Sequence, residues 1–248
     1  MANILLEICC GSPDDVVAAE AGGADRVELC SALFLGGLTP SLGSLVNAKV
    51  RSRLPVMAMV RPRAAGFCYS ATEIEVMERD AALFVEHGAD GVVFGILKPD
   101  RTVDVERCHR IRKPIGERQA VFHRAFDIVP DPLQALDELI DLGFTRVLTS
   151  GQQSTALEGS ALIRKLVEHA QGRIEILPGA GIRPHNVQEL IRATGCSQIH
   201  TTAFRRLDDP STVGSHIKYG SVLNPSESAH DLADRNEVRR LRETLGGI

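Results

Sequence analysis

Tryptophan is absent from this chain of 248 residues, and only two residues are tyrosine. Proteins that bind single-stranded nucleic acid stack its bases on aromatic side chains, so this scarcity argues against such a function. A formal net charge of −4 argues against attachment to DNA or anionic lipid by bulk charge. We therefore expect neither a nucleic acid nor a membrane as a partner.

Long apolar runs and an export signal are absent as well. No apolar run approaches the roughly 18 residues needed to cross a bilayer. The first residues contain no basic segment and reach Glu7 early, unlike a signal peptide. None of the six cysteines belongs to a Cys-x-x-Cys pair, which excludes a zinc knuckle or a thioredoxin-type motif. These features predict a cytoplasmic protein with reduced thiols.

One pattern repeats along the whole chain: a short apolar run, a polar or glycine-containing turn, and then a helical stretch. Eight such runs start 22 to 36 residues apart, which is the length of one strand-and-helix unit. The predicted strands span residues 4–10, 26–31, 55–63, 91–97, 118–127, 146–151, 174–182 and 198–203.

Eight such units in about 250 residues predict a (β/α)8 TIM barrel that forms one domain over residues 1–248. A doubly wound open sheet is the alternative, but its strands are usually apolar on both faces. Here several strands alternate apolar with charged residues, as expected for side chains that point alternately to the helices and into a barrel. We expect a long loop over residues 204–229 after the eighth strand, and a C-terminal helix over 234–245.

Strand alternation predicts which side chains face the interior of the barrel. The predicted interior set near the carboxyl ends of the strands is Glu7, Cys9, Glu28, Cys30, Arg61, Arg63, His123, Ala125, Asp127, His200 and Thr202. Glu28 or Arg63 alone would be interpreted as a member of a structural ion pair. Burying so many ionisable groups is costly unless they are paired or hydrated. Their convergence on one rim therefore favours a ligand pocket.

The pocket residues allow two interpretations of their chemistry. Arg61 has the planar fork that binds a carboxylate or phosphate, but it could equally neutralise Glu7 and Glu28. His123 is the best general acid or base by its intrinsic pKa. The candidate catalytic residues are Glu7, Glu28, Arg61 and His123. Lysine is scarce, and none of the five lysines lies inward on a strand, which argues against a Schiff-base mechanism.

Gly179 and Gly181 follow the seventh strand and allow close backbone approach to an anion, as in phosphate-binding barrels. The eighth strand lacks the glycine that usually completes such a site, so the phosphate signal is weak. We predict further ligand contacts from Arg63, Asp127, Ser150, Gly179, Gly181, His200 and Thr202.

Two metal sites are conceivable from the interior residues. Carboxylate and imidazole groups from Glu7, Glu28, His123 and His200 suit zinc or manganese. Cys9 and Cys30 occupy matching positions in Leu-Glu-Ile-Cys and Val-Glu-Leu-Cys on neighbouring strands, and two soft thiolates suit Cu(I). Free cysteines are often small buried hydrophobes, and the pattern alone favours that interpretation.

Several motifs closely resemble the CutC family of copper-homeostasis-type proteins. They are Leu6-Glu7-Ile8-Cys9, Gly23-Ala24-Asp25-Arg26-Val27-Glu28-Leu29-Cys30, Gly36-Gly37-Leu38-Thr39-Pro40-Ser41, Arg61-Pro62-Arg63, Phe122-His123-Arg124-Ala125-Phe126-Asp127, Arg146-Val147-Leu148-Thr149-Ser150-Gly151 and Gly179-Ala180-Gly181. The resemblance implies a cytoplasmic TIM barrel, a homodimer or homotetramer, and Cu(I) binding by Cys9 and Cys30. It implies no other cofactor and assigns no reaction.

The chain departs from the family pattern at two places. The first arginine motif continues as Ala64-Ala65-Gly66-Phe67 where the family usually has Gly-Gly-Asp-Phe, and the Arg-Asn pair expected near residues 216–220 is missing. Two functional hypotheses follow. The first is a copper homeostasis protein that binds Cu(I). The alternative is an enzyme that uses the rim pocket on a small anionic or sugar-like substrate.

Overall fold

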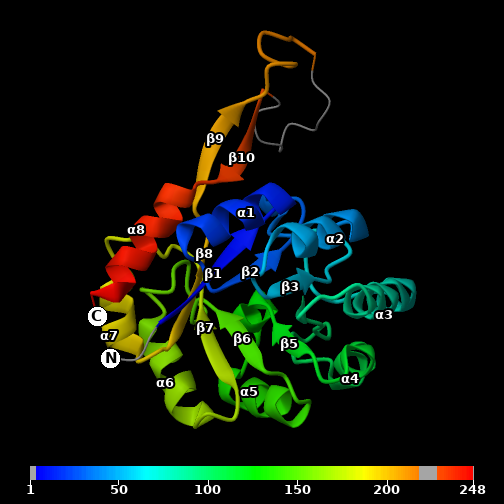
Figure 1. Cartoon of the computed structure of the whole chain (residues 1–248). Helices are drawn as coiled ribbons and strands as arrows, with labels where there is room; N and C mark the ends of the chain where they lie inside the picture. Colours follow the sequence, from blue (N-terminus) through cyan, green and yellow to red (C-terminus); the bar gives the residue numbers. More distant parts are fainter. Residues whose placement is uncertain (1–3, 218–227, 248) are drawn as a thin grey trace.

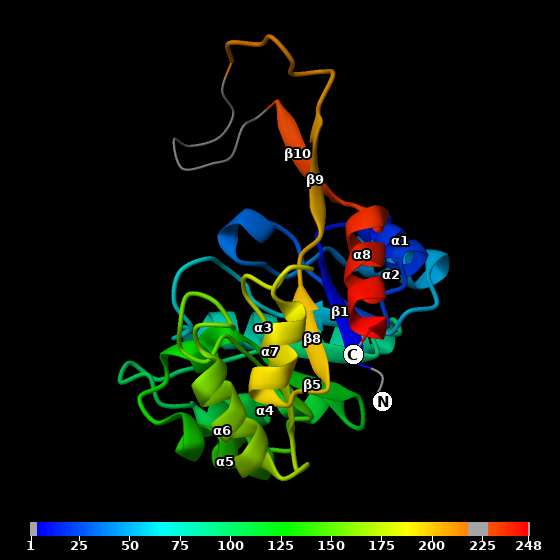
Figure 2. The same ribbon diagram turned by 90° about the vertical axis from the view of Figure 1, so that its left-hand side faces the viewer.

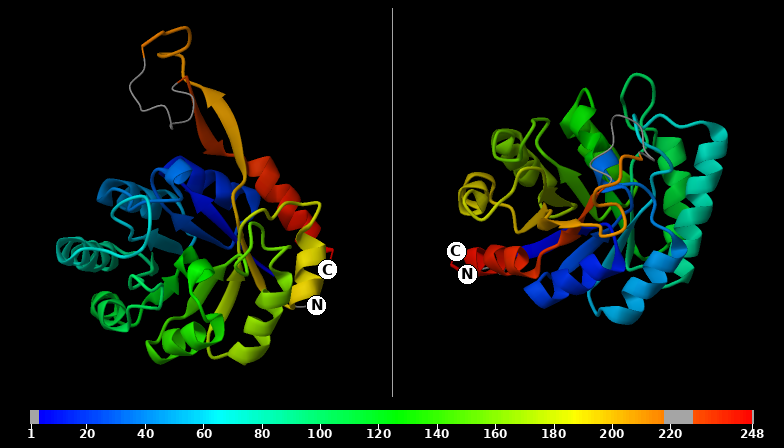
Figure 3. Two further views of the ribbon diagram at one scale, coloured as in Figure 1. Left: turned by 180° about the vertical axis from the view of Figure 1, so that it is seen from behind. Right: turned by 90° about the horizontal axis from the view of Figure 1, so that it is seen from above.

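The computed structural model describes residues 4–217 and 228–247. A barrel of parallel strands forms its centre, with helices around the outside (Figures 1 and 3). The barrel strands are β1 (Leu5–Cys10), β2 (Arg26–Leu29), β3 (Val56–Met59), β4 (Gly91–Phe94), β5 (Gln119–Phe122), β6 (Arg146–Thr149), β7 (Glu175–Pro178) and β8 (Gln198–Thr201). The predicted (β/α)8 barrel is confirmed.

The barrel is nearly closed. Each strand from β1 to β7 pairs in parallel with the next one in sequence, and β8 pairs with β1. Across the described residues, no backbone ladder joins β7 to β8. Side chains bridge this seam instead: the Thr201 hydroxyl donates to the carbonyl of Ile182 at 2.8 Å, and the Gln198 amide donates to Glu175 at 3.2 Å.

Eight helices of the described chain follow the strands. They are α1 (Pro13–Gly22), α2 (Leu42–Arg51), α3 (Ala71–Glu86), α4 (Val105–Ile115), α5 (Pro132–Asp141), α6 (Ser160–Ala170), α7 (Val187–Thr194) and α8 (Arg235–Gly246). The predicted C-terminal helix over residues 234–245 is present as α8. Asp234 caps it by accepting a hydrogen bond from the amide N–H of Asn236. In the part of the chain that the structure describes, no helix is both long and apolar enough to span a bilayer.

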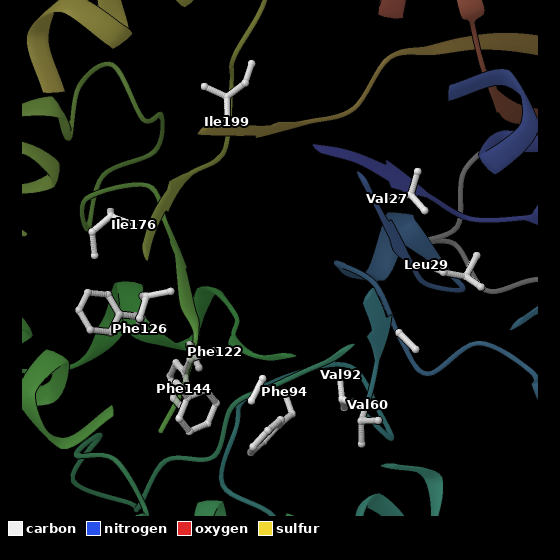
Figure 4. Packing of buried hydrophobic residues seen from close by; sticks show 14 of the residues in the cluster. Val27, Leu29, Val60, Val92, Phe94, Phe122, Phe126, Phe144, Ile176 and Ile199 are labelled. Carbon is white, nitrogen blue, oxygen red and sulfur yellow. The ribbon is translucent and has the colours of Figure 1, made fainter. Parts of the chain in front are cut away.

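Strand alternation divides the buried apolar side chains into two sets. The larger set lies between the strands and the helices, and Figure 4 shows it from Val27 and Leu29 on β2 to Ile199 on β8. A smaller set fills the middle of the barrel and consists of Cys9, Cys30, Met57, Met59, Val93 and Val121. This second set closes the barrel below its carboxyl rim.

All the predicted barrel strands except the first end earlier in the structure. The third ends at Met59, the fifth at Phe122 and the seventh at Pro178, four or five residues before their predicted ends. After β5 the ring of His123 accepts the amide N–H of Ala125, which turns the chain into the short 3-10 helix η2 (Arg124–Ile128). Ala125 therefore packs in the outer core, and its predicted position inside the barrel was wrong.

The predicted loop over residues 204–229 contains regular structure in its described parts. Strand β9 (Phe204–Asp208) pairs antiparallel with β10 (Ala229–Ala233), and this ribbon projects from the barrel (Figure 2). Residues 218–227 lie outside the described residues, as does most of the segment near 216–220 where the family motif is missing. The ribbon was not predicted because its exposed strands carry charged residues and lack an apolar face.

Asp15 on α1 anchors the base of this ribbon. Its carboxylate accepts the amide N–H of Ala233 at 2.6 Å and that of Gly11 at 2.8 Å, and the side chain is buried. Replacing Asp15 by Ala would leave the buried amide of Ala233 and the partly buried amide of Gly11 without this acceptor. We expect Asp15→Ala to lower the free energy of unfolding by about 3 kcal/mol in urea titrations.

The neighbouring exposed carboxylate supplies the control. Asp14→Ala should cost less than about 1 kcal/mol, since it removes only a favourable charge near the start of α1. Equal costs for the two variants would contradict an anchoring role for Asp15.

Candidate functional site

A cavity of about 540 Å³ opens at the carboxyl rim of the barrel. Seven of the residues singled out in the sequence line it: Cys9, Glu28, Arg61, His123, Asp127, His200 and Thr202. Apolar side chains that the sequence analysis did not identify complete the wall, among them Phe67, Leu148 and Phe204. Leu148 follows the same strand alternation as the charged set and could have been found. Phe67 and Phe204 lie beyond the ends of β3 and β8, where alternation gives no signal.

Glu7 lies below this cavity, where two cations hold its carboxylate. The guanidinium of Arg26 on β2 donates to one oxygen, and Nδ1 of His200 on β8 lies 2.7 Å from the other. Burial alone would raise the pKa of Glu7, but Arg26 and His200 together hold it well below its usual range. The carboxylate is therefore ionised, although only 2% of the residue is exposed.

Arg26 was not among the predicted site residues. It is the first residue of β2 and shares the inward phase of Glu28 and Cys30, so alternation alone could have identified it. It also donates to the side-chain oxygen of Gln198 at 2.9 Å, and Arg146 donates to that same oxygen at 3.0 Å. These groups form a polar layer at the amino end of the barrel.

His200 links this layer to the cavity. Its Nε2 lies 3.8 Å from Oε2 of Glu28, opposite the nitrogen that contacts Glu7. Burial opposes the charged imidazole, but Glu28, Cys9 and Glu7 raise the pKa of His200 well above its ordinary value. His200 therefore carries a positive charge against the thiols at the rim.

Cys9 and Cys30 converge on Glu28. Their Sγ atoms lie 3.3 Å and 3.4 Å from the same carboxyl oxygen. The hydrogen bond from Cys30 lowers the pKa of Cys9 to about 5 against the effect of burial, and His200 lowers it further. Burial and the adjacent Cys9 raise the pKa of Glu28, while the bond to Cys9 and burial raise that of Cys30. Of these three groups, Cys9 is the one whose pKa is lowered, so it is the thiolate of the cluster.

Arg61 does not neutralise Glu7 and Glu28, so that interpretation of the sequence is wrong. Its terminal nitrogens donate to the backbone carbonyls of Leu35 and Gly37 on one side and of Ala65 on the other, each at 2.9 Å. Arg26 and His200 meet the charge of Glu7 instead, while burial and Cys9 raise the pKa of Glu28. The residues that hold Arg61 come from loops, where strand alternation has no predictive power.

His123 lines the cavity as predicted, but its pKa differs from that expected of a general acid or base. Burial is the first cause and the charge of Arg61 the second, and together they lower the pKa of His123 to about 3. The ring is therefore neutral near pH 7. It lies against Phe67, with ring centroids 4.9 Å apart.

The remaining predicted contacts lie partly outside the cavity. Arg63 forms an ion pair with Glu73 and lies over the ring of Tyr69, because β3 ends too early for alternation to reach it. Asp127 lines the cavity, and its carboxylate accepts hydrogen bonds from the backbone amide and the hydroxyl of Ser150. Ser150 itself is not among the described residues that line the cavity. Gly179 and Gly181 are not among the described residues that line this cavity, and their predicted ligand contact stays a prediction.

The paired charges below the cavity should matter for stability. Among the described residues, Arg26→Met leaves the buried carboxylate of Glu7 with His200 as its remaining ion-pair partner. We expect a loss of about 3 kcal/mol in the free energy of unfolding at pH 7. Glu7 contributes stability above its ordinary pKa of 4.5, and this is lost as the pH falls. The difference between wild type and Arg26→Met should therefore shrink below pH 4.5 in denaturant titrations.

Arg110→Met is the matched control, because Arg110 pairs with Glu78 at 2.8 Å on the surface. It should cost at most about 1 kcal/mol and show little dependence on pH. A small, pH-independent loss in Arg26→Met would mean that Glu7 does not depend on this guanidinium.

The chain matches known proteins along nearly its whole length. The model of the CutC family matches residues 4–205. A CutC family protein of Treponema denticola is 55% identical over 246 residues, covering 99% of this chain and all of the relative. The human protein named copper homeostasis protein cutC homolog is 44% identical, covering 99% of this chain and 90% of the relative.

Solved structures agree with the fold. The crystal structure of CutC from Streptococcus agalactiae superimposes with a TM-score of 0.76 at 35% identity, over 80% of this chain and 98% of that one. Phosphoribosylanthranilate isomerase from Thermotoga maritima shares the barrel with a TM-score of 0.57 but only 12% identity, over 99% of this chain and 100% of that one. With two full-length relatives above 40% identity and a family model that covers most of the chain, this protein belongs to the CutC family.

Proposed function

We propose that this chain binds Cu(I) between Cys9 and Cys30 and serves copper homeostasis. The convergence of both thiols on Glu28, with ligand atoms of all three residues within 4.8 Å of one another, carries the proposal. Two soft sulfur ligands select Cu(I) over harder cations. Relatives named copper homeostasis protein support the same function.

The protonation states of the two thiols fit such a ligand. Metal binding requires deprotonated sulfur, and Cys9 meets this requirement at neutral pH because its pKa is lowered to about 5. Cys30 holds its proton and would release it when Cu(I) binds. Met59 packs in the same cluster and lines the cavity, so a thioether, another soft ligand type, stands beside the pair.

Other buried cysteines of the chain show what a purely structural thiol looks like here. Cys10 and Cys108 lie in the outer core. Each thiol donates a hydrogen bond to a backbone carbonyl, with sulfur–oxygen distances of 3.6 Å for Cys10 and 3.8 Å for Cys108. Burial is the largest cause of the raised pKa of both thiols. Cys9 and Cys30 differ from them because both contact the Glu28 carboxyl group, and Cys9 also lines the cavity.

A reducing compartment is part of this proposal, since all six cysteines are free, and the cytoplasm is the compartment we expect. The expected homodimer or homotetramer remains a prediction. The alternative hypothesis, an enzyme acting on a small anionic or sugar-like substrate, also remains one. A cavity with Arg61, His123 and apolar side chains in its wall supports that small-molecule site.

Competition between the protein and a Cu(I) chelator such as bicinchoninate, under reducing conditions, tests the proposal. We expect stoichiometric binding by the wild type. Cys9→Ser and Cys30→Ser should each weaken it by more than about tenfold, since each removes one of two sulfur ligands.

Cys108→Ser and Cys196→Ser are the controls, because both thiols are buried away from the rim. They should bind copper as the wild type does. Equal losses in all four variants would indicate adventitious thiol binding, and no loss in Cys9→Ser or Cys30→Ser would refute the site.

A further inference from the structure

Sulfur-bearing side chains from three consecutive strands meet in the middle of the barrel. Cys9 comes from β1, Cys30 follows directly after β2, and Met59 ends β3; all three belong to one buried cluster. Met59 is 3% exposed, and it lines the rim cavity together with Cys9. The cavity therefore gives access to a thioether as well as to a thiol.

The strand register places Met59 beside Cys30. In the ladder between β2 and β3, Glu28 lies opposite Met57. Side chains alternate along a strand, so the next inward residues are Cys30 and Met59, each two positions further toward the carboxyl rim. These two side chains are therefore neighbours across the ladder.

Gly37 shows that the ends of the two side chains lie close to one another. A Cβ atom at this position would lie 3.0 Å from Sγ of Cys30 and 3.8 Å from the methyl carbon of Met59. The Gly37 carbonyl accepts a hydrogen bond from Arg61 at 2.9 Å, which holds the backbone in place there. Gly37 has a φ of +82°, a conformation that favours glycine, so no side chain intrudes on the two sulfur-bearing groups.

Met57, the other methionine of the cluster, is placed differently. Its sulfur packs against Gly91 on β4, where a Cβ atom would lie 2.6 Å from Sδ. Met57 is completely buried and is not among the described residues that line the cavity. Its sulfur fills the space beside a glycine, which is a common packing use of methionine. Met57 is therefore a matched comparison on the same strand.

A third ligand from Met59 suits Cu(I) better than an oxygen of Glu28 does. Thiolate and thioether sulfur are the soft ligands that Cu(I) prefers, whereas carboxylate oxygen suits harder cations. A thioether is also neutral. It can complete the coordination of Cu(I) without adding to the negative charge of two thiolates in a buried site, where excess charge is costly.

We propose that Sδ of Met59 is a third ligand to Cu(I), beside the sulfur atoms of Cys9 and Cys30. This role rests on the proposed function, because it concerns the same copper site. Methionine is unbranched and has three rotatable side-chain bonds, so Met59 can turn its sulfur toward a metal held by the two thiols.

Competition with bicinchoninate under reducing conditions compares the two methionines. Met59→Leu nearly keeps the volume of the side chain and removes the sulfur, so we expect it to weaken Cu(I) binding by about tenfold. Met57→Leu makes the same change at a sulfur that packs against β4, and it should bind Cu(I) as the wild type does. Thermal melting checks that each variant is folded, and Met59→Ile replaces a Met59→Leu variant that is not.

Methyl resonances give a direct readout of coordination in the wild type. In protein labelled with methyl-¹³C methionine, one equivalent of Cu(I) should shift the Met59 signal, because its methyl group is bonded to the ligating sulfur. The Met57 signal should shift much less. Each signal is assigned by its absence from the corresponding leucine variant.

Three results would overturn a ligand role for Met59: no shift of any methionine methyl signal when Cu(I) binds to the wild type, unchanged Cu(I) affinity in Met59→Leu, or an equal loss in Met57→Leu. Failure of the copper site itself is distinguishable. If Cys9→Ser and Cys30→Ser lose Cu(I) and Met59→Leu keeps it, the role of Met59 alone is refuted. If the wild type does not bind Cu(I) stoichiometrically, the proposed function fails as well.

Discussion

The carboxylate of Glu7 is the interaction on which the interior of the barrel depends. It is ionised and buried, and it is tolerated only because Arg26 on β2 and His200 on β8 meet it from the two strands beside β1. The contact therefore links three neighbouring strands. It also fixes the charge of His200, which in turn lies beside Glu28 and favours the thiolate form of Cys9. The lowered pKa of Cys9 therefore depends on the ion pairs of Glu7, which lie one layer below the rim.

The arginines at the two ends of the barrel interior are held by different kinds of partner. At the amino end, Arg26 and Arg146 share Gln198, so the deepest charges have partners within the protein. Methionine, valine and cysteine side chains close the middle. Near the carboxyl rim, backbone carbonyls of Leu35, Gly37 and Ala65 hold the guanidinium of Arg61.

Strand alternation accounts for what could be predicted from the sequence. It placed Glu28 correctly and could have placed Arg26, since both follow the same phase on β2. It failed at Arg63, because β3 ends four residues earlier and the chain has already turned away. It could not predict the environment of Arg61, whose partners are loop carbonyls far apart in sequence. The ribbon within residues 204–229 was missed because a doubly exposed strand pair has no apolar periodicity.

The charge of His200 and the thiolate of Cys9 can be tested together by ultraviolet absorbance at 240 nm, where thiolates absorb and thiols do not. In wild type, absorbance that Cys9→Ser lacks should disappear with a midpoint near pH 5, the pKa to which Cys9 is lowered. In His200→Gln that midpoint should rise by about one unit or more, because the positive charge beside the thiolate is gone. A wild-type midpoint above pH 8, or the same midpoint in His200→Gln, would contradict this account of the site.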